Sequence, residues 1–259
     1  RMFPTAQTLA RTYSDREYAD PWEKVLDYQR VQEYIAENPK HGRVRVGNNL
    51  DLPPNRVRAW INGGMPDSIR GIQSAIDHGW LDPDPTSGIA GGLVKLLAHI
   101  LAGGSITADT FVPAVTVGRR VNLDTIQEAF NRVGVEANIR NDGVDKRATE
   151  VFPADDASVL GRCLITMGAT AGKKTELESF PTIIFEVPLD IQKSAAQIYV
   201  AHRGIEYPQK ETMVIREKRS ESYLEGLKDL LIQVTGEAIT IGDQTVTISA
   251  NAARVLNKA

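Results

Sequence analysis

The feature that most constrains this chain is a short pattern that occurs twice, with its closing glycines one hundred residues apart. Residues 96–106 read LLAHILAGGSI, and residues 196–205 read AQIYVAHRGI. Each copy is an apolar run rich in small residues, which predicts a helix, and each continues through a glycine into a short strand-like run. The repeat therefore predicts a domain of two similar halves, whose two repeat helices pack together as its spine.

Residues that follow each repeat helix predict the same order of elements twice. In the first half, strands are expected at 105–108 and 111–117, a helix at 122–133, a hairpin of 137–141 with 147–152, and a helix that Asp155 or Asp156 caps and that runs to Met167. In the second half, a helix is expected at 188–202, strands at 205–207 and 212–216, a helix at 223–234, a hairpin of 237–241 with 245–248, and a helix at 250–256. The prediction is an α+β domain of two αββαββα halves, repeat one at about 89–152 and repeat two at about 188–259.

The first copy of the pattern closely resembles the signature of the LAGLIDADG homing endonucleases, often written LLGFILGDGSI. Seven residues match it: Leu96, Leu97, Ile100, Leu101, Gly104, Ser105 and Ile106. The ordered resemblance covers about residues 91–259, including the inter-repeat passage with its Gly172-Lys173-Lys174-Thr175 turn. It implies a pseudo-twofold fold whose saddle-shaped antiparallel sheets together follow duplex DNA.

The chain departs from this family at the position that carries its chemistry. Where the family places a metal-binding aspartate, this chain has Gly103 in one repeat and Arg203 in the other. Neither supplies the anionic oxygen ligands that hard divalent cations require. The resemblance therefore implies the scaffold without the nuclease, with no catalytic residue, metal or cofactor. An active or residual endonuclease that uses Asp109 or Glu206 as displaced carboxylates is the main alternative.

Residues 20–81 predict a separate, all-helical domain. Helices are expected from Asp20-Pro21 to residue 37 and at 43–50, 54–61 and 67–78. The short second helix, tight turn and arginine-bearing third helix resemble a helix-turn-helix module. The residues expected to contact DNA are Asn55, Arg56 and Arg58 near the start of the third helix, with Arg43 and Arg45 upstream. The alternative is a small helical bundle whose arginines are merely solvated.

Two segments without periodic pattern complete the domain organisation. Residues 1–19 are expected to form an arm of uncertain order, and residues 82–88, DPDPTSG, a linker that its two prolines keep extended. The second domain then comprises residues 89–259.

Basic residues lie on or beside the predicted strands, where side chains on one face of a sheet can reach DNA phosphates. They are Arg119, Arg120, Arg140, Lys146 and Arg147 in the first half and Arg216, Lys218 and Arg219 in the second half. Further candidate DNA contacts are Lys173 and Lys174 between the repeats and Arg203 at the end of the second repeat helix. Interspersed acids such as Asp142 and Glu217 leave an ordinary charged surface as the alternative. Lys173 and Lys174 either contact a phosphate or merely cover a loop.

Composition sets limits on these interpretations. The net charge of −3 provides no general attraction to nucleic acid, so DNA binding must depend on local clusters of Lys and Arg. No apolar run approaches the roughly 18 residues that a membrane span needs. The single cysteine, Cys163, excludes an intrachain disulfide and is expected in a core in a reducing cytoplasm. The four dispersed histidines show no zinc-ligand spacing, and His99 is expected to be a core residue.

Together these observations predict a two-domain, sequence-specific protein that binds double-stranded DNA and acts as a transcriptional regulator. We expect no enzymatic activity, a cytoplasmic, nucleoid-associated location, and either a monomer with internal pseudo-twofold symmetry or a dimer. Bacterial sporulation regulators show a similar combination of domains in reversed order, and the helix-turn-helix stretch resembles chromosomal proteins of salt-loving archaea. A protein-interaction scaffold in which neither surface contacts DNA is a further alternative.

Overall fold

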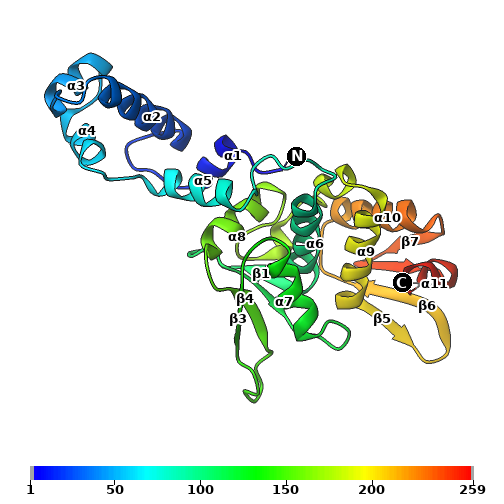
Figure 1. Ribbon diagram of the computed structural model, residues 1–259. Coiled ribbons are helices and arrows are strands. Elements are labelled where there is room, and N and C mark those ends of the chain that lie inside the picture. Colours follow the sequence, from blue (N-terminus) through cyan, green and yellow to red (C-terminus); the bar gives the residue numbers. More distant parts are fainter. Residues whose placement is uncertain (1–2, 258–259) are drawn as a thin grey trace. The chain divides into compact units, whose positions relative to one another are not determined.

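The computed structural model describes residues 3–257 of the 259-residue chain. In that range it is an α+β protein with eleven α-helices and two antiparallel four-stranded sheets (Figure 1). The chain forms two compact units, one of Thr5–Asp77 and one of the chain from His78 onward together with Phe3 and Pro4. No helix within the described range combines the length and the apolar character needed to cross a membrane.

The unit Thr5–Asp77, hereafter the helical unit, is built entirely from helices. These are α1 (Ala6–Ala10), α2 (Pro21–Glu37), α3 (Arg43–Leu50), α4 (Pro54–Ile61) and α5 (Asp67–Asp77). Asp20 caps α2 by accepting a hydrogen bond from the backbone N–H of Trp22, and Pro21 occupies the first helical position. The expected bounds of α2, α3 and α4 are confirmed because cap and proline signals are local.

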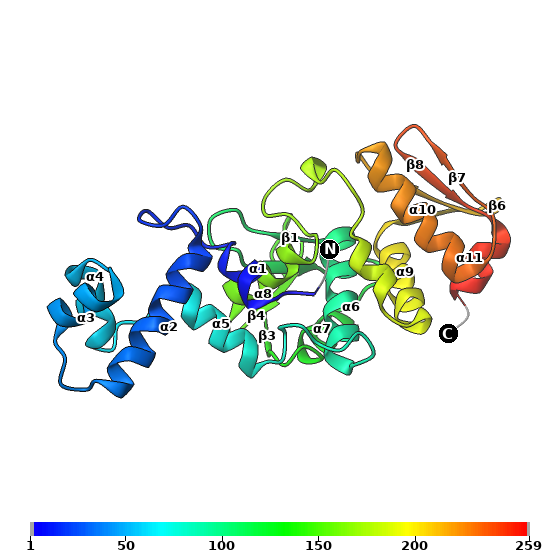
Figure 2. The same ribbon diagram turned by 90° about the horizontal axis from the view of Figure 1, so that it is seen from above.

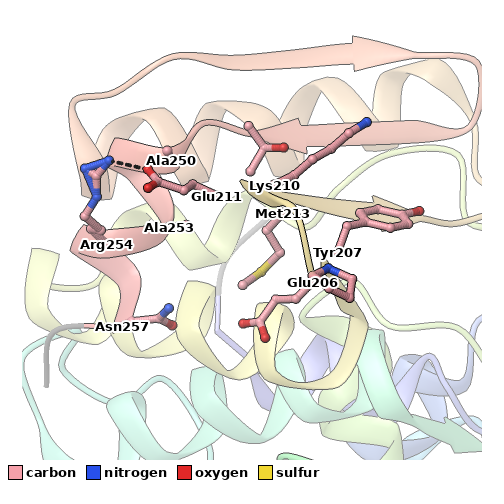
Figure 3. Close-up of a pocket in the computed structure, with 11 residues that line it drawn as sticks. Glu206, Tyr207, Lys210, Glu211, Met213, Ala250, Ala253, Arg254 and Asn257 are labelled. Atoms are coloured by element: carbon pink, nitrogen blue, oxygen red, sulfur yellow. Dashed lines mark hydrogen bonds and ion pairs between the residues drawn. The ribbon is translucent and has the colours of Figure 1, made fainter.

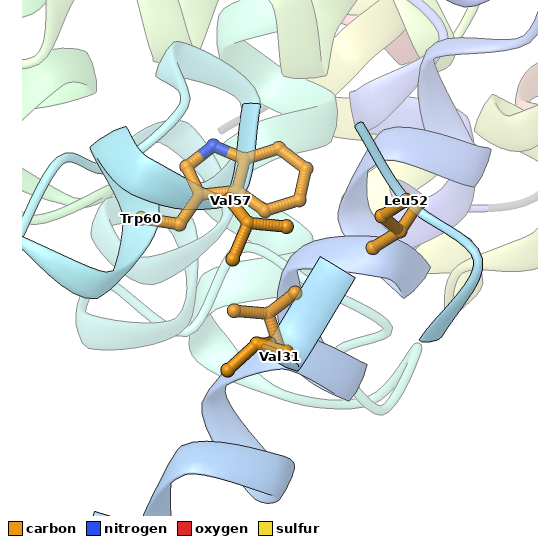
Figure 4. Close-up of a cluster of buried hydrophobic side chains, with 5 residues drawn as sticks. Val31, Leu52, Val57 and Trp60 are labelled. Atoms are coloured by element: carbon orange, nitrogen blue, oxygen red, sulfur yellow. The ribbon is translucent and has the colours of Figure 1, made fainter. Parts of the chain in front are cut away.

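A small apolar core holds α2, α3 and α4 together (Figure 4). Its buried members are Val31, Val46, Leu52, Val57 and Trp60. Leu52 comes from the turn between α3 and α4, so burial of this one side chain fixes the turn against the helices. The Trp60 indole also meets the Tyr28 ring edge-on, with 5.7 Å between ring centroids.

The expectation of an N-terminal arm over residues 1–19 is wrong for the described residues. Thr5 and Thr8 form a reciprocal capping box at the start of α1, and Leu9 and Ala10 are buried. Helix α1 packs against α5 within the helical unit. The apolar pattern is too short to reveal this helix, because only two of its five residues are buried. Residues 1 and 2 lie outside the described range.

The linker predicted at residues 82–88 is also wrong, because the division between the units lies at Asp77 and His78. Trp80 is fully buried and its indole N–H donates to the carbonyl of Val133 at 2.8 Å. The backbone N–H of Asp82 donates to the Pro4 carbonyl, and Ser87 caps the next helix. The proline-rich composition is thus that of ordered turns on the second unit.

The second unit contains the expected order of elements twice, each time helix, two strands, helix, two strands, helix. The first set is α6 (Gly88–Gly103), β1 (Gly104–Ile106), β2 (Pro113–Thr116), α7 (Leu123–Asn131), β3 (Ala137–Arg140), β4 (Glu150–Pro153) and α8 (Ala157–Thr166). The second set is α9 (Leu189–Arg203), β5 (Gly204–Tyr207), β6 (Lys210–Arg216), α10 (Glu221–Thr235), β7 (Ile239–Gly242), β8 (Thr245–Ile248) and α11 (Ala250–Asn257). Two 3₁₀ turns, Lys174–Glu176 and Thr182–Glu186, lie between them.

The two sheets share one topology. Their strand orders are β1-β2-β4-β3 and β5-β6-β8-β7, and every pairing is antiparallel. Side chains alternate along the central strands: Val246 and Ile248 are buried, whereas Thr245 and Thr247 are half-buried. Each sheet therefore has one face covered by helices and one that is more open.

Helices α6 and α9 pack side by side at the centre of the second unit, and both views show them between the two sheets (Figures 1 and 2). Ala98 and Ala102 are buried on α6, as expected for small residues at a helix seam. At the ends of the two helices, a Cβ on Gly104 would lie 2.5 Å from the Ala114 carbonyl oxygen, and one on Gly204 2.7 Å from that of Val200. Close approach of backbone therefore requires both repeat glycines.

Asp156 does not cap α8 as expected. It stands at the N-cap in a left-handed conformation (φ 48°) and makes no side-chain cap hydrogen bond. Its carboxylate instead lies 2.9 Å from Nε2 of His78, whose ring stacks on Trp80. The Asp156 side chain thus contacts His78, 78 positions earlier, instead of a backbone N–H of α8.

Candidate nucleic-acid interface

The exposed surface of α3 and α4 carries four of the five side chains that sequence reasoning assigned to DNA in the helical unit. Asn55 and Arg58 are exposed on α4, and Arg43 and Arg45 are exposed on α3. Within the described chain, none of these three arginines has a carboxylate within 4.0 Å. They are therefore free to contact an external anion.

Arg56 is placed differently from its neighbours on α4. Its Nε lies 3.0 Å from Glu17 Oε2, one Nη donates to the Tyr18 hydroxyl at 3.1 Å, and its guanidinium lies 4.5 Å from the Tyr18 ring centroid. Tyr18 in turn donates to Asp27 on α2. Arg56 thus ties α4 to the preceding chain, and nothing in the local sequence distinguishes it from Arg58.

In the second unit, three basic side chains converge on the C-terminal end of α6. Lys174 donates to the carbonyls of Ile100 and Leu101, Arg219 to that of Leu101 at 3.0 Å, and Arg203 to that of Ala102 at 2.7 Å. The last carbonyls of a helix have no intrahelical donor and carry partial negative charge, so they attract cations. Lys174 and Arg219 are therefore bound within the protein rather than displayed on its surface.

One buried carboxylate, Glu217, balances part of this charge. It lies 2.9 Å from Arg203 Nε and 3.7 Å from Arg219 Nε, and it accepts a hydrogen bond from the Tyr199 hydroxyl. Burial, followed by the nearby charges of Arg203 and Arg219, lowers the pKa of Lys174 to about 8. The cluster thus still has a positive excess, because three cations share one buried anion.

A pair of histidines lies beside this cluster at the α6–α9 seam. His99 Nδ1 and His202 Nε2 are 2.9 Å apart, so one ring donates a hydrogen bond and the other accepts it. Burial lowers the pKa of His99 to about 3 and that of His202 to about 4, and both rings are therefore neutral near pH 7. A Cβ built on Gly103 would overlap the His202 ring, so His202 fills the space beside Gly103.

A cavity of about 660 Å³ opens next to His202, and arginines dominate its lining. We call it the arginine cavity. It is lined by Arg119, Arg120, Ala201, His202, Arg203, Gly204, Ile205, Glu206 and Arg216. Arg119 and Arg120 come from the β2–α7 loop, Arg203 from the end of α9, and Arg216 from the end of β6. The fold therefore gathers four arginines that are dispersed over 98 positions of the sequence (119 to 216).

The other expected phosphate contacts are spread over the second unit. Arg140 lies opposite Glu150 on the neighbouring strand, 2.7 Å from its carboxylate. Arg147 is exposed in the β3–β4 loop, because β4 begins at Glu150 rather than at the predicted 147. Lys173 and Lys218 are exposed in connections. Of the expected phosphate contacts in this unit, Arg140 and Arg216 lie on strands, and most of the others lie in the connections between elements.

A second cavity, of about 580 Å³, lies between the β5–β6 hairpin and α11 (Figure 3). Its lining includes Glu206, Lys210, Glu211 and Arg254, and Arg254 pairs with Glu211 at 3.0 Å. Two acids and two bases balance one another here. This cavity therefore has no preference for an anionic ligand, in contrast to the arginine cavity.

The acids suggested as displaced metal ligands differ in their surroundings. Asp109 is exposed in the β1–β2 turn, and Glu206 on β5 pairs with Arg120 at 3.1 Å. Within residues 3–257, no group of three or more His, Cys, Asp or Glu side chains is arranged to hold a metal ion. Cys163 is fully buried and burial raises the pKa of its thiol to about 12.

Sequence reasoning placed His99 in a core, and the structure confirms this because His99 is buried. It did not foresee the His99–His202 contact, nor the contact of Glu217 with the Tyr199 hydroxyl, which also lies 3.1 Å from the Tyr223 hydroxyl. The partners in each pair are separated by 18 to 103 positions, so no local spacing marks them. Aligning the two repeat segments of the sequence gives one signal for this centre, since Arg203 then corresponds to Gly103. Comparison with known proteins adds no family to these observations: no protein-family model and no curated protein matches the chain.

Proposed function

We propose that this protein binds double-stranded DNA in a sequence-specific manner and acts as a transcriptional regulator. The observation that carries the proposal is the α3–α4 surface, on which Asn55, Arg58, Arg43 and Arg45 are all exposed. Asp51 is the one acidic residue between residues 43 and 61, in a chain whose overall net charge is negative. Local positive charge on a helix–turn–helix arrangement is the electrostatic requirement for binding phosphates.

The dimensions of α4 suit the recognition helix of such a module. An α-helix with its side chains is about 10–12 Å in diameter, which fits the roughly 12 Å width of the DNA major groove, and α4 is eight residues long. Arg58 is able to contact guanine through two hydrogen bonds and Asn55 to contact adenine in the same way. Arg43 and Arg45 on α3 then supply phosphate contacts. Arg56 supports α4 from within, through Glu17 and Tyr18.

For the second unit we propose a LAGLIDADG-like scaffold that does not cleave DNA. The repeated element order, the matching strand orders and the α6–α9 packing support the scaffold. The space beside Gly103 supports the loss of cleavage, because His202 fills it and Arg203 brings a positive charge to the carbonyl of Ala102. A divalent cation would be repelled by that charge and would find no carboxylate on either repeat helix end.

Selection from random-sequence duplexes with the full-length chain tests DNA recognition. A selected site should then be compared with random duplex by fluorescence anisotropy at two salt concentrations. Arg58→Ala should weaken binding to the selected site by about 1–3 kcal/mol and binding to random DNA much less. Arg70→Ala is the matched control, because Arg70 is an exposed arginine on α5 that pairs with Asp67. Failure to select any sequence, or salt-independent binding, would refute the proposal.

Cleavage has its own test. Supercoiled plasmid incubated with the protein and Mg²⁺ or Mn²⁺ should stay supercoiled. Metal-dependent nicking that disappears in Asp109→Asn or Glu206→Gln would show that displaced carboxylates act as ligands and would overturn the non-cleaving scaffold.

A further inference from the structure

The arginine cavity has more positive charge than its surroundings neutralise. Four arginines and one carboxylate line it, and the neutral His202 adds no charge, which leaves a net charge of +3. Arg120 pairs with Glu206, and Arg203 pairs with Glu217 behind the wall. Arg119 and Arg216 have no carboxylate within 4.0 Å among the residues that the structure describes.

Two further cations near Arg203 add to this excess, Lys174 and Arg219. Both use their donors on carbonyls, those of Ile100 and Leu101 for Lys174 and those of Leu101 and Lys174 for Arg219. Glu217 is already shared between Arg203, Arg219 and the Tyr199 hydroxyl. The inner charges are thus partly satisfied by the protein, whereas Arg119 and Arg216 line the cavity and have no carboxylate partner among the described residues.

Geometry and chemistry favour one kind of anion. Guanidinium groups offer planar pairs of N–H donors that match the oxygens of phosphate and carboxylate. A cavity of about 660 Å³ lies within the range of about 300–1,000 Å³ typical of small-ligand sites, so it holds more than a single small ion. Convergence of four arginines from three segments, the β2–α7 loop, the end of α9 and the end of β6, supports an anion with several oxygens on different sides, which a tetrahedral phosphate provides.

We propose that the arginine cavity is a phosphate-binding site, in which Arg119 and Arg216 are the principal ligands and Arg203 is a third. The phosphate belongs either to a free phosphorylated molecule or to the backbone of bound DNA. A backbone phosphate as the ligand rests on the proposed function, whereas a free phosphorylated molecule as the ligand does not. In both cases the site lies in the second unit and is distinct from the α3–α4 surface of the helical unit.

The test uses the full-length chain and pyrophosphate as the probe. Isothermal titration at low salt should show saturable binding that Arg119→Ala and Arg216→Ala each weaken about tenfold or more, equivalent to about 1.4 kcal/mol. Arg147→Ala is the matched control, because Arg147 is an exposed arginine of the same unit outside the cavity. Both tested side chains are exposed, and circular dichroism should confirm unchanged folding.

Competition with a duplex then identifies the source of the phosphate. If pyrophosphate displaces DNA and the two cavity variants also weaken DNA binding, the natural ligand is a backbone phosphate. If the variants lose pyrophosphate but retain DNA, it is a free phosphorylated molecule. Absence of pyrophosphate binding in the wild type, or equal binding by all three variants, would overturn the phosphate site. Arg58→Ala should leave pyrophosphate binding unchanged. A failure of the proposed DNA recognition can therefore be distinguished from a failure of the phosphate site.

Discussion

Replacing Glu217 by glutamine tests whether the buried cluster at the end of α6 stabilises the second unit. Its carboxylate pairs with both Arg203 and Arg219, and its side chain is 4% exposed. Glutamine keeps the size of the side chain but removes the charge. Lys174, Arg203 and Arg219 would then repel one another without a compensating anion, and the Tyr199 hydroxyl would lose its charged acceptor.

Breaking a buried ion pair by removing one partner typically costs about 3–5 kcal/mol. We expect the lower end, about 3 kcal/mol, because the Arg203 side chain is 39% exposed and water can solvate it, whereas Arg219 is only 3% exposed. For a unit of this size each kcal/mol lowers the melting temperature by about 2–4 °C, so the expected fall is about 6–12 °C.

Differential scanning calorimetry of the full chain measures this effect, provided that the transition of the second unit is resolved from that of the helical unit. Glu206→Gln is the matched control, because Glu206 also pairs with an arginine but is 62% exposed. Its removal should cost less than about 1 kcal/mol. If both variants melt within about 2 °C of the wild type, or the control falls further, then the cluster contributes no net stability and the reasoning is refuted.

Three further predictions concern the histidine pair, the helix seam and Arg56. The pKa values of His99 and His202 fall from 6.5 to about 3 and about 4 on folding, so their contribution to stability is fully present above pH 6.5 and is lost as pH falls toward 4. Urea denaturation between pH 6.5 and 4.5 should show that the free energy of unfolding falls by up to about 1.4 kcal/mol per pH unit for each histidine. The double His→Asn variant should lose this pH dependence. If the difference in stability between that variant and the wild type is the same at every pH in the window, the linkage is contradicted. Ala102→Leu should overpack the α6–α9 seam and destabilise the second unit by about 1–3 kcal/mol. Ala108→Leu is the control and should not destabilise the unit, because Ala108 lies in an exposed turn. An unchanged melting temperature for both variants would mean that the seam tolerates the added volume. Arg56→Ala should destabilise the helical unit by about 1–2 kcal/mol through loss of its contacts with Glu17 and Tyr18, and equal stability of Arg56→Ala and Arg58→Ala in urea would show that those contacts do not form.

Much of the secondary structure was predictable because its signals are local. Proline at the start of α2 and α4, the glycines that follow α6 and α9, and the alternation of apolar residues in β8 all act over a few residues. The order of elements in both halves of the second unit was therefore correct. Strand bounds shifted by up to three residues, as at β4, where the preceding loop has Lys146 in a left-handed conformation that its residue type does not signal.

The role of each basic side chain was not predictable in the same way. Arg56 and Arg58 are two positions apart on one helix, yet Arg56 is held by Glu17 and Tyr18, 39 and 38 positions earlier, while Arg58 is exposed. Lys174 and Arg219 looked like surface cations, but carbonyls at the end of α6 bind both. Whether an arginine is free depends on which acid or carbonyl approaches it, and long-range folding decides that.

The sequence by itself determined the repeat, the two kinds of unit and the absence of a carboxylate at positions 103 and 203, because each depends on residue type and periodic spacing alone. Only the tertiary structure decided where the units divide, since the Trp80 indole finds its acceptor at Val133. It also decided that His202 fills the space beside Gly103 and that Arg119, Arg120, Arg203 and Arg216 meet around one cavity. These features depend on contacts between segments up to about a hundred residues apart, and local propensities carry no information about such contacts.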